Sequence, residues 1–168
     1  MTSIPDFQSL LSKVKELKNS GKLDLSLEED LSIAVMNLIS LEEHFFFTSQ
    51  KTGKDSYLDL LKQIREIRKK LLARLINSHE GETWCITKHL LGTTMRLMEV
   101  ATKLLGEGKS KEAKKMFSLS YQVYSLFWAL RLKLIELKSI KSPEFYPSDG
   151  KSWTMSDIVT KLVDCCKE

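Results

Sequence analysis

Residues that break helices are confined almost entirely to short stretches between long uninterrupted segments. Inside a helix, proline costs about 3 kcal/mol and glycine about 1 kcal/mol relative to alanine. Of three prolines and seven glycines, Gly92 alone interrupts a long periodic segment. The others mark chain ends and junctions: Pro5, Pro143, Pro147, Gly21, Gly53, Gly81, Gly106, Gly108 and Gly150. This distribution predicts a chain built from helices.

Apolar residues recur at helical spacing between these breakers, and no strand-like alternation is present. The predicted helices span 5–19, 27–48, 56–77, 82–105, 110–140 and 155–167. In the second helix, Ser26 begins a capping box that ends at Glu29. Short joins between the middle helices make neighbours antiparallel. We therefore expect an all-α fold, an up-and-down helical bundle of four main helices plus two flanking helices. It forms a single domain over 1–168, with an N-terminal flanking helix in 1–22 and a loop and C-terminal helix in 142–168.

Several features bear on where the chain resides. The N-terminus lacks the basic and apolar regions of a secretory signal. The longest uncharged run, 116–130, has 15 residues, whereas a membrane-spanning helix needs about 20. Three cysteines without regular spacing argue against a disulfide framework. We expect a cytoplasmic protein with no membrane partner.

The segment 110–140 is apolar around most of its circumference. Two adjoining faces carry its large apolar side chains, and a strip of mostly short side chains completes the wheel: Lys115, Ser118, Gln122, Ser125 and Ala129. A helix of this kind is buried on several sides. Two interpretations follow. The helix lies at the centre of the bundle, or it is shared with a second copy across the strip, which makes the protein a homodimer.

Charges are segregated along the chain. Residues 23–47 hold six acids and no Lys or Arg, whereas residues 62–74 hold six bases and one acid. Antiparallel packing of these segments would bring opposite charges together. Two of the charged residues, Glu42 and Arg68, fall at wheel positions otherwise occupied by apolar residues. We expect a buried structural ion pair, an Arg68 side chain that reaches water from the edge of the apolar stripe, or a polar pocket in which Arg68 holds a ligand carboxylate or phosphate.

A cysteine and a histidine form a second candidate site. Cys85 and His89 are four residues apart and share a helix face with Arg96. Cys85 falls in the first turn of its helix, where the helix dipole favours a reactive thiol. Two ligands are too few for zinc. No histidine has a glutamate three residues before it, as di-iron bundles require. We expect no metal site and no cofactor.

The motif Arg-x4-His occurs once, at Arg74 and His79. It resembles the motif of HEPN domains, helical bundles of which many cleave RNA as dimers. The resemblance implies that Arg74 and His79 would converge on an RNA backbone. A basic face on the same predicted helix, formed by Lys62, Arg65 and Lys69, would either be solvated or bind nucleic acid.

Two further resemblances imply no particular activity. Residues 97–120 are similar to the second half of a tetratricopeptide unit, with Gly108, Ala113, Phe117 and Ser120 at the matching positions. We interpret them as a tight helical hairpin, because a repeat needs neighbours. Residues 41–47 and 84–89 resemble stretches of small all-helical microbial proteins.

These observations favour a non-enzymatic binding or adaptor module whose partner is another protein or a second copy of the chain. The basis is the absence of a recognisable reactive constellation and the presence of one unusually apolar helix. An RNA-binding or RNA-cleaving protein of HEPN type is the alternative. A small-ligand pocket at Glu42 and Arg68 is the weaker alternative.

Overall fold

The computed structural model describes residues 24–76 and 82–133, together with positions 12, 15, 16, 19 and 20. Four long helices make up this part of the chain, and no strand occurs in it: α2 (Leu25–Thr52), α3 (Ser56–Leu75), α4 (Glu82–Gly106) and α5 (Ser110–Arg131). The predicted all-α class with four main helices is therefore confirmed. Of the predicted flanking helices, 155–167 lies outside the described residues. Helix 5–19 is represented only by the helical positions 12, 15, 16 and 19.

Helix α2 begins earlier and ends later than its pattern predicts. The prediction of a cap at Ser26 is wrong, because Asp24 is the N-cap. Its carboxylate accepts hydrogen bonds from the backbone N–H groups of Ser26 and Leu27, both at 3.1 Å. At the other end the helix continues to Thr52, and Gly53 adopts φ 65°, which glycine tolerates best.

Helix α5 ends sooner than predicted. The expectation of a helix continuing to residue 140 is wrong, because α5 stops at Arg131. The N–H of Lys133 donates to the carbonyl of Leu130 at 3.0 Å, which tightens the last turn, and Lys133 adopts φ 54°. Neither glycine nor proline occurs at this turn, so a search for breakers could not find it. Residues 134–140 lie outside the described part.

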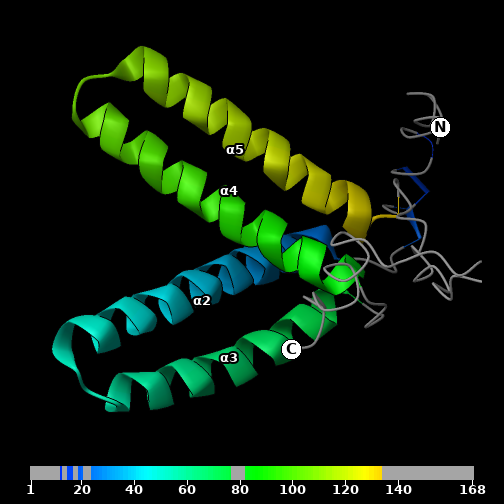
Figure 1. The fold of residues 1–168 in the computed structure, drawn as a ribbon. Coiled ribbons are helices and arrows are strands. Elements are labelled where there is room, and N and C mark those ends of the chain that lie inside the picture. The colour runs from blue at the N-terminus through cyan, green and yellow to red at the C-terminus, as the bar shows by residue number, and fades with distance from the viewer. Residues whose placement is uncertain (1–11, 13–14, 17–18, 21–23, 77–81, 134–168) are drawn as a thin grey trace, which may run out of the picture.

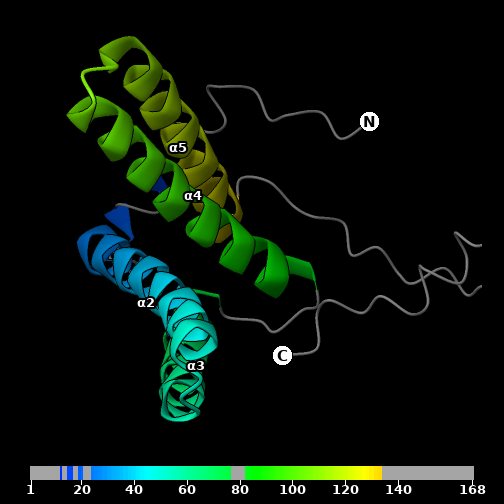
Figure 2. The ribbon, with the colours of Figure 1, turned by 60° about the vertical axis from the view of Figure 1, so that its left-hand side comes forward.

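The helices form two antiparallel hairpins, α2–α3 and α4–α5, that diverge from a common base (Figure 1). The two hairpins pack against each other mainly through α2 and α4. Figure 2 shows each hairpin as a separate pair of helices, with their turns well apart. At the base, Arg131 on α5 pairs with Glu28 on α2 at 2.8 Å, with both side chains largely buried.

One glycine explains how closely the hairpins approach. A Cβ placed on Gly92 in α4 would lie 3.3 Å from Cγ2 of Ile39 in α2. Nearly all other residues at this position would need the neighbouring side chain to move. The glycine that interrupts the fourth predicted helix therefore marks the crossing of α2 and α4.

The core lies where all four helices meet, near the base of the hairpins. Its buried apolar members come from every helix: Val35, Met36, Leu72, Leu75, Ile76, Trp84, Cys85, Leu91 and Phe127. Two polar contacts reinforce it. The hydroxyls of Ser32 and Tyr124 are 2.7 Å apart and join α2 to α5. The hydroxyl of Ser120 donates to the carbonyl of Thr94 at 2.9 Å and joins α5 to α4.

The interpretation of 110–140 as the central helix is wrong. Helix α5 packs mainly on α4, with Ala113, Ser120 and Phe127 buried. Its outer side remains at the surface, where Tyr121 is 74% exposed and Leu126 is 49% exposed. The central positions belong to α2 and α4 instead, because each of these two helices packs extensively against two others.

Candidate functional site

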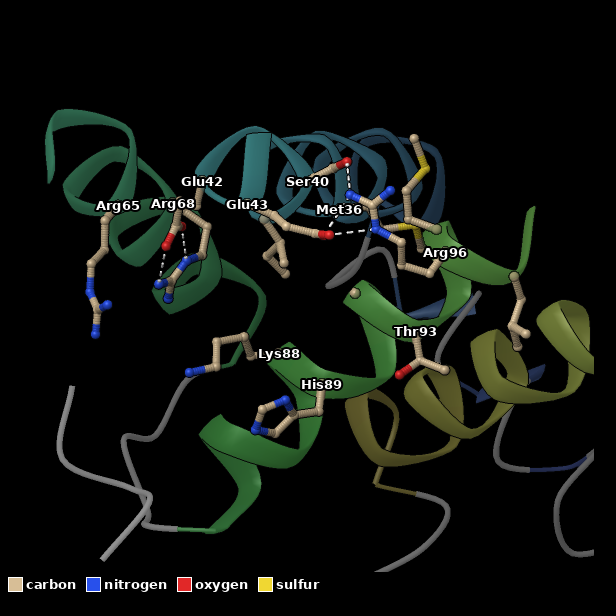
Figure 3. A pocket seen from close by; sticks show the side chains of 14 residues that line it. Met36, Ser40, Glu42, Glu43, Arg65, Arg68, Lys88, His89, Thr93 and Arg96 are labelled. Carbon is tan, nitrogen blue, oxygen red and sulfur yellow. Dashed lines mark hydrogen bonds and ion pairs between the residues drawn. The ribbon is translucent and has the colours of Figure 1, made fainter. Parts of the chain in front are cut away.

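A cleft of about 450 Å³ opens between the two hairpins, lined by side chains from α2, α3 and α4. Its walls combine charged groups with methionine and aliphatic side chains, among them Met36, Ile39, Met95 and Leu97. The divergence of the hairpins creates this space, because α3 and α4 contact each other little. Figure 3 shows the polar side chains that face it.

An ion pair between Glu42 on α2 and Arg68 on α3 lines the cleft. Nε of Arg68 donates to Oε1 of Glu42 at 2.7 Å, and Nη2 donates to Oε2 at 3.2 Å. The structure thus brings together the two charges that the helical wheels placed in the core. Arg68 is 1% exposed and Glu42 is 15% exposed. The bidentate geometry is the strongest form of this interaction and fixes α3 against α2.

A second ion pair lies further along the cleft. Nε of Arg96 on α4 donates to Oε2 of Glu43 on α2 at 2.8 Å. Nη2 of Arg96 also donates to the hydroxyl of Ser40 at 3.0 Å. This pair is about half exposed, so its net contribution to stability is small. The pair lines the end of the cleft away from Arg65 (Figure 3).

The other end of the cleft is basic. Arg65 extends from α3, and Lys88 extends from α4 toward the same space beneath Arg68 (Figure 3). His89 lies beside Lys88 and is exposed. Four cationic side chains therefore line the cleft, namely Arg65, Arg68, Lys88 and Arg96, against the carboxylates of Glu42 and Glu43. Among the described lining residues, Lys and Arg therefore outnumber Glu by two.

Cys85 and His89 do not form a joint site. Cys85 is 2% exposed and belongs to the hydrophobic core. His89 lies on the wall of the cleft with Arg96, as the shared face predicts. The expectation that Cys85 shares this face is wrong, because its side chain turns toward the core. A buried thiol surrounded by apolar side chains is chemically inert.

The three residues of the predicted basic face have different surroundings in the structure. Lys62 is exposed, and Nζ of Lys69 lies 3.4 Å from Oε1 of Glu66 on the same helix. Arg65 instead lines the cleft. These three residues therefore do not present one continuous basic surface.

Of the Arg-x4-His motif, Arg74 lies within the described residues and His79 does not. Arg74 lies exposed in the last turn of α3. His79 falls outside the described residues, so the convergence that the HEPN resemblance implies remains a prediction.

A second concave surface lies between α4 and α5. It is an apolar groove of about 490 Å³, lined by Thr94, Met98, Phe117, Ser118, Ser120, Tyr121 and Tyr124. Large apolar side chains at its rim are open to solvent, with Met98 44%, Phe117 37% and Tyr121 74% exposed. Leu119 and Leu126, on another side of α5, are 43% and 49% exposed.

Neither a metal site nor a membrane-spanning helix is found in the described part of the chain. No group of three or more His, Cys, Asp or Glu side chains lies close enough there to hold a metal ion. None of the described helices has both the length and the apolar character needed to cross a membrane.

Sequence reasoning found Glu42, Arg68 and Arg65 but did not connect Lys88 to them. Lys88 looks like an ordinary solvated lysine beside His89. The signal that could have found it is Gly92, one helical turn further on, because that glycine marks where α2 crosses α4. Comparison with known proteins adds no name to this site. No protein-family model matches the chain, and no curated protein or solved structure is detectably similar to it.

Proposed function

We propose that the protein is a non-enzymatic binding module that self-associates through the outer surface of α5. The observation that carries this proposal is the exposure of Tyr121, 74% of whose surface is open to solvent within a groove of apolar side chains. Aromatic side chains supply much of the energy of protein interfaces. Contiguous apolar surface of this kind marks interaction sites.

A second copy of the chain suits this surface because the surface carries no charge. Residues 116–130 contain no Asp, Glu, Lys or Arg, and most of α5 is formed by them. Two copies can therefore meet without burying a charge, which would cost several kcal/mol per unpaired ion. Between the exposed aromatic and aliphatic side chains lie Ser118, Gln122 and Ser125, all exposed. Short residues such as the two serines let two helices approach closely.

The geometry is compatible with a two-fold axis. In an isologous dimer the same patch occurs on both sides, so Phe117 and Tyr121 of one copy would meet leucines of the other. A large aromatic side chain buries roughly 150–250 Å², and a stable interface buries about 1,200–2,000 Å² in total. Two copies of Phe117, Tyr121, Leu119 and Leu126 would cover much of that area. We also place the module in the cytoplasm, because three cysteines without regular spacing argue against a disulfide framework.

Light scattering on a gel-filtration peak tests the proposal. The native chain should elute with about twice the monomer mass of 19.3 kDa. The Tyr121→Glu and Leu126→Glu variants should elute as monomers, because each places a charge in the proposed dimer interface. Leu58→Glu is the matched control, since Leu58 on α3 is 40% exposed and lies away from α5. This variant should remain dimeric.

Two outcomes would refute self-association. One is a native chain that stays monomeric at every concentration tested. The other is a dimer that persists in both α5 variants. Heterologous partners captured by a monomeric native chain would point to the same surface with a different occupant and would also count against a homodimer.

A further inference from the structure

The two ends of α5 lie in surroundings of opposite charge. At its outer end, the stretch 103–115 contains five lysines and two glutamates, and all five lysines are exposed. At the base, α5 ends beside the start of α2, where Arg131 pairs with Glu28 at 2.8 Å. The stretch 24–30 at this start contains four acids and no Lys or Arg. The α4–α5 hairpin is therefore basic at its turn and lies against an acidic segment at its base.

Both charged ends adjoin the apolar groove between α4 and α5. Lys114 precedes Tyr121 by seven residues, or about two helical turns, so both lie on the side of α5 that carries the groove. At the other end of the groove, the hydroxyl of Tyr124 is 2.7 Å from that of Ser32 on α2. The Ser32 hydroxyl also donates to the carbonyl of Glu29 at 2.7 Å. Lys114 and Glu29 are exposed, and neither side chain belongs to an ion pair within the described residues.

We propose that two copies of the chain associate with their α5 helices antiparallel, so that Lys114 of each copy faces Glu29 of the other. This inference rests on the proposed self-association through α5 and adds its orientation. A two-fold axis permits either a parallel or an antiparallel pair of helices. A parallel pair would place lysines beside lysines and acids beside acids. Charge complementarity selects the antiparallel pair, because like charges across an interface oppose association.

The dimensions of α5 suit this orientation. Seventeen residues separate Lys114 from Arg131, which corresponds to about 26 Å of helix. The middle of this span is at Tyr121 and Gln122, within the uncharged segment 116–130. A two-fold axis at this point places Lys114 of one copy level with Arg131 of the other, and so with the start of the partner's α2. Rotation about this axis also leaves both grooves on the same side of the helix pair. Lys114 and the acidic segment of the partner therefore share a side as well as a level.

Sedimentation equilibrium of the full chain measures how reversal of these charges changes the dissociation constant of the dimer. Lys114→Glu and Glu29→Lys should each raise this constant about tenfold, because symmetry applies each change at two contacts and replaces attraction by repulsion. The chain that carries both substitutions again has opposite charges at each contact. Its dissociation constant should return to within about threefold of the native value, which would also show that neither single change acts by unfolding the protein.

A mixture of the two single variants gives an independent measurement. Each mixed dimer of Lys114→Glu and Glu29→Lys chains has one native contact and one exchanged contact, and both are attractive. The mixture should therefore associate more tightly than either variant alone. Added salt should weaken the native dimer and strengthen the dimers of the single variants, because it screens attraction and repulsion alike.

The adjacent residues supply matched controls. At about 100° per residue, Lys115 lies about 120° from Tyr121 around α5, whereas Lys114 lies about 20° from it. Asp30 lies about 160° from Ser32 around α2, so it is on the side of α2 away from α5. Both control side chains are exposed. Lys115→Glu and Asp30→Lys make the same changes of charge outside the proposed contact and should alter the dissociation constant by less than about threefold.

Two results would overturn the antiparallel orientation and leave self-association in place. One is a native dimer whose dissociation constant is unchanged in Lys114→Glu and Glu29→Lys, or is raised in them without recovery in the double variant. The other is an equal loss of affinity in Lys115→Glu and Asp30→Lys, which would show a general effect of net charge. A native chain that stays monomeric would instead refute the self-association itself, and this orientation with it.

Discussion

Removal of either partner of the Glu42–Arg68 pair should have very different consequences from removal of both. The two side chains make a bidentate contact, and the guanidinium is nearly inaccessible, with 1% exposure against 15% for the carboxylate. Methionine fills a similar volume without a charge. The informative set is therefore Glu42→Met, Arg68→Met and the double variant.

The expected magnitudes follow from which charge is left behind. Glu42→Met leaves a buried guanidinium without its carboxylate, and breaking a buried pair in this way costs about 3–5 kcal/mol. Arg68→Met leaves a carboxylate that water can still reach, so we expect a smaller loss of about 1–3 kcal/mol. In the double variant neither charge of this pair remains to be solvated. Its stability should lie within about 1 kcal/mol of the native chain, because buried pairs replaced by apolar side chains are often neutral.

Urea unfolding followed by circular dichroism measures these differences, with the m-value as a check that each variant unfolds in one transition. For a domain of this size, 1 kcal/mol shifts the Tm by about 2–4 °C. The coupling free energy is the change in the double variant minus the sum of the changes in the two single variants. Its magnitude should reach several kcal/mol. If all three variants lie within about 0.5 kcal/mol of the native chain, the pair is not buried in solution and the reasoning fails.

Two smaller perturbations test how the hairpins are joined. Tyr124→Phe removes the hydroxyl that lies 2.7 Å from Ser32 and should lower the free energy of unfolding by about 1 kcal/mol; an unchanged urea midpoint would contradict this contact. Gly92→Leu places a side chain where Ile39 lies 3.3 Å from a Cβ, so α2 must move away from α4. We expect a loss of about 1–3 kcal/mol, measured in the same way, and a gain in stability from the better helix former would show that the crossing is loose.

The helices themselves could be predicted because their determinants are local. Breakers and apolar spacing act within one helical turn or at its ends, so the starts of α3, α4 and α5 agree with their patterns. The cap of α2 was misassigned because Asp24 and Ser26 are both good capping residues two positions apart. The choice between them depends on the path of the preceding chain. The end of α5 at Arg131 could not be predicted, because it depends on backbone geometry at Lys133 rather than on a breaker.

The place of α5 in the fold was mispredicted for a different reason. A helical wheel counts apolar residues around the circumference but does not count how many partners are available to cover them. In this chain α2 and α4 form the contact between hairpins, so α5 has only one main neighbour. Tyr121 and Leu126 stay exposed as a result. The wheels of the second and third predicted helices placed Glu42 and Arg68 at core positions but left a pair and a ligand pocket as alternatives. The structure pairs the two residues within one hairpin, where the short turn at Gly53 fixes the register.

The divergence of the two hairpins accounts both for the cleft between them and for the exposed side of α5. In a closed four-helix bundle, α3 would pack beside α4 or α5, and the space beneath Arg68 would be filled by apolar side chains. The open arrangement leaves the outer side of α5 without a neighbour among the other described helices. A single geometric feature, the crossing of α2 and α4 at Gly92, therefore sets the separation of α3 from α5 on which both surfaces depend. A change that closed the angle between the hairpins should narrow the cleft and alter the exposure of α5 together.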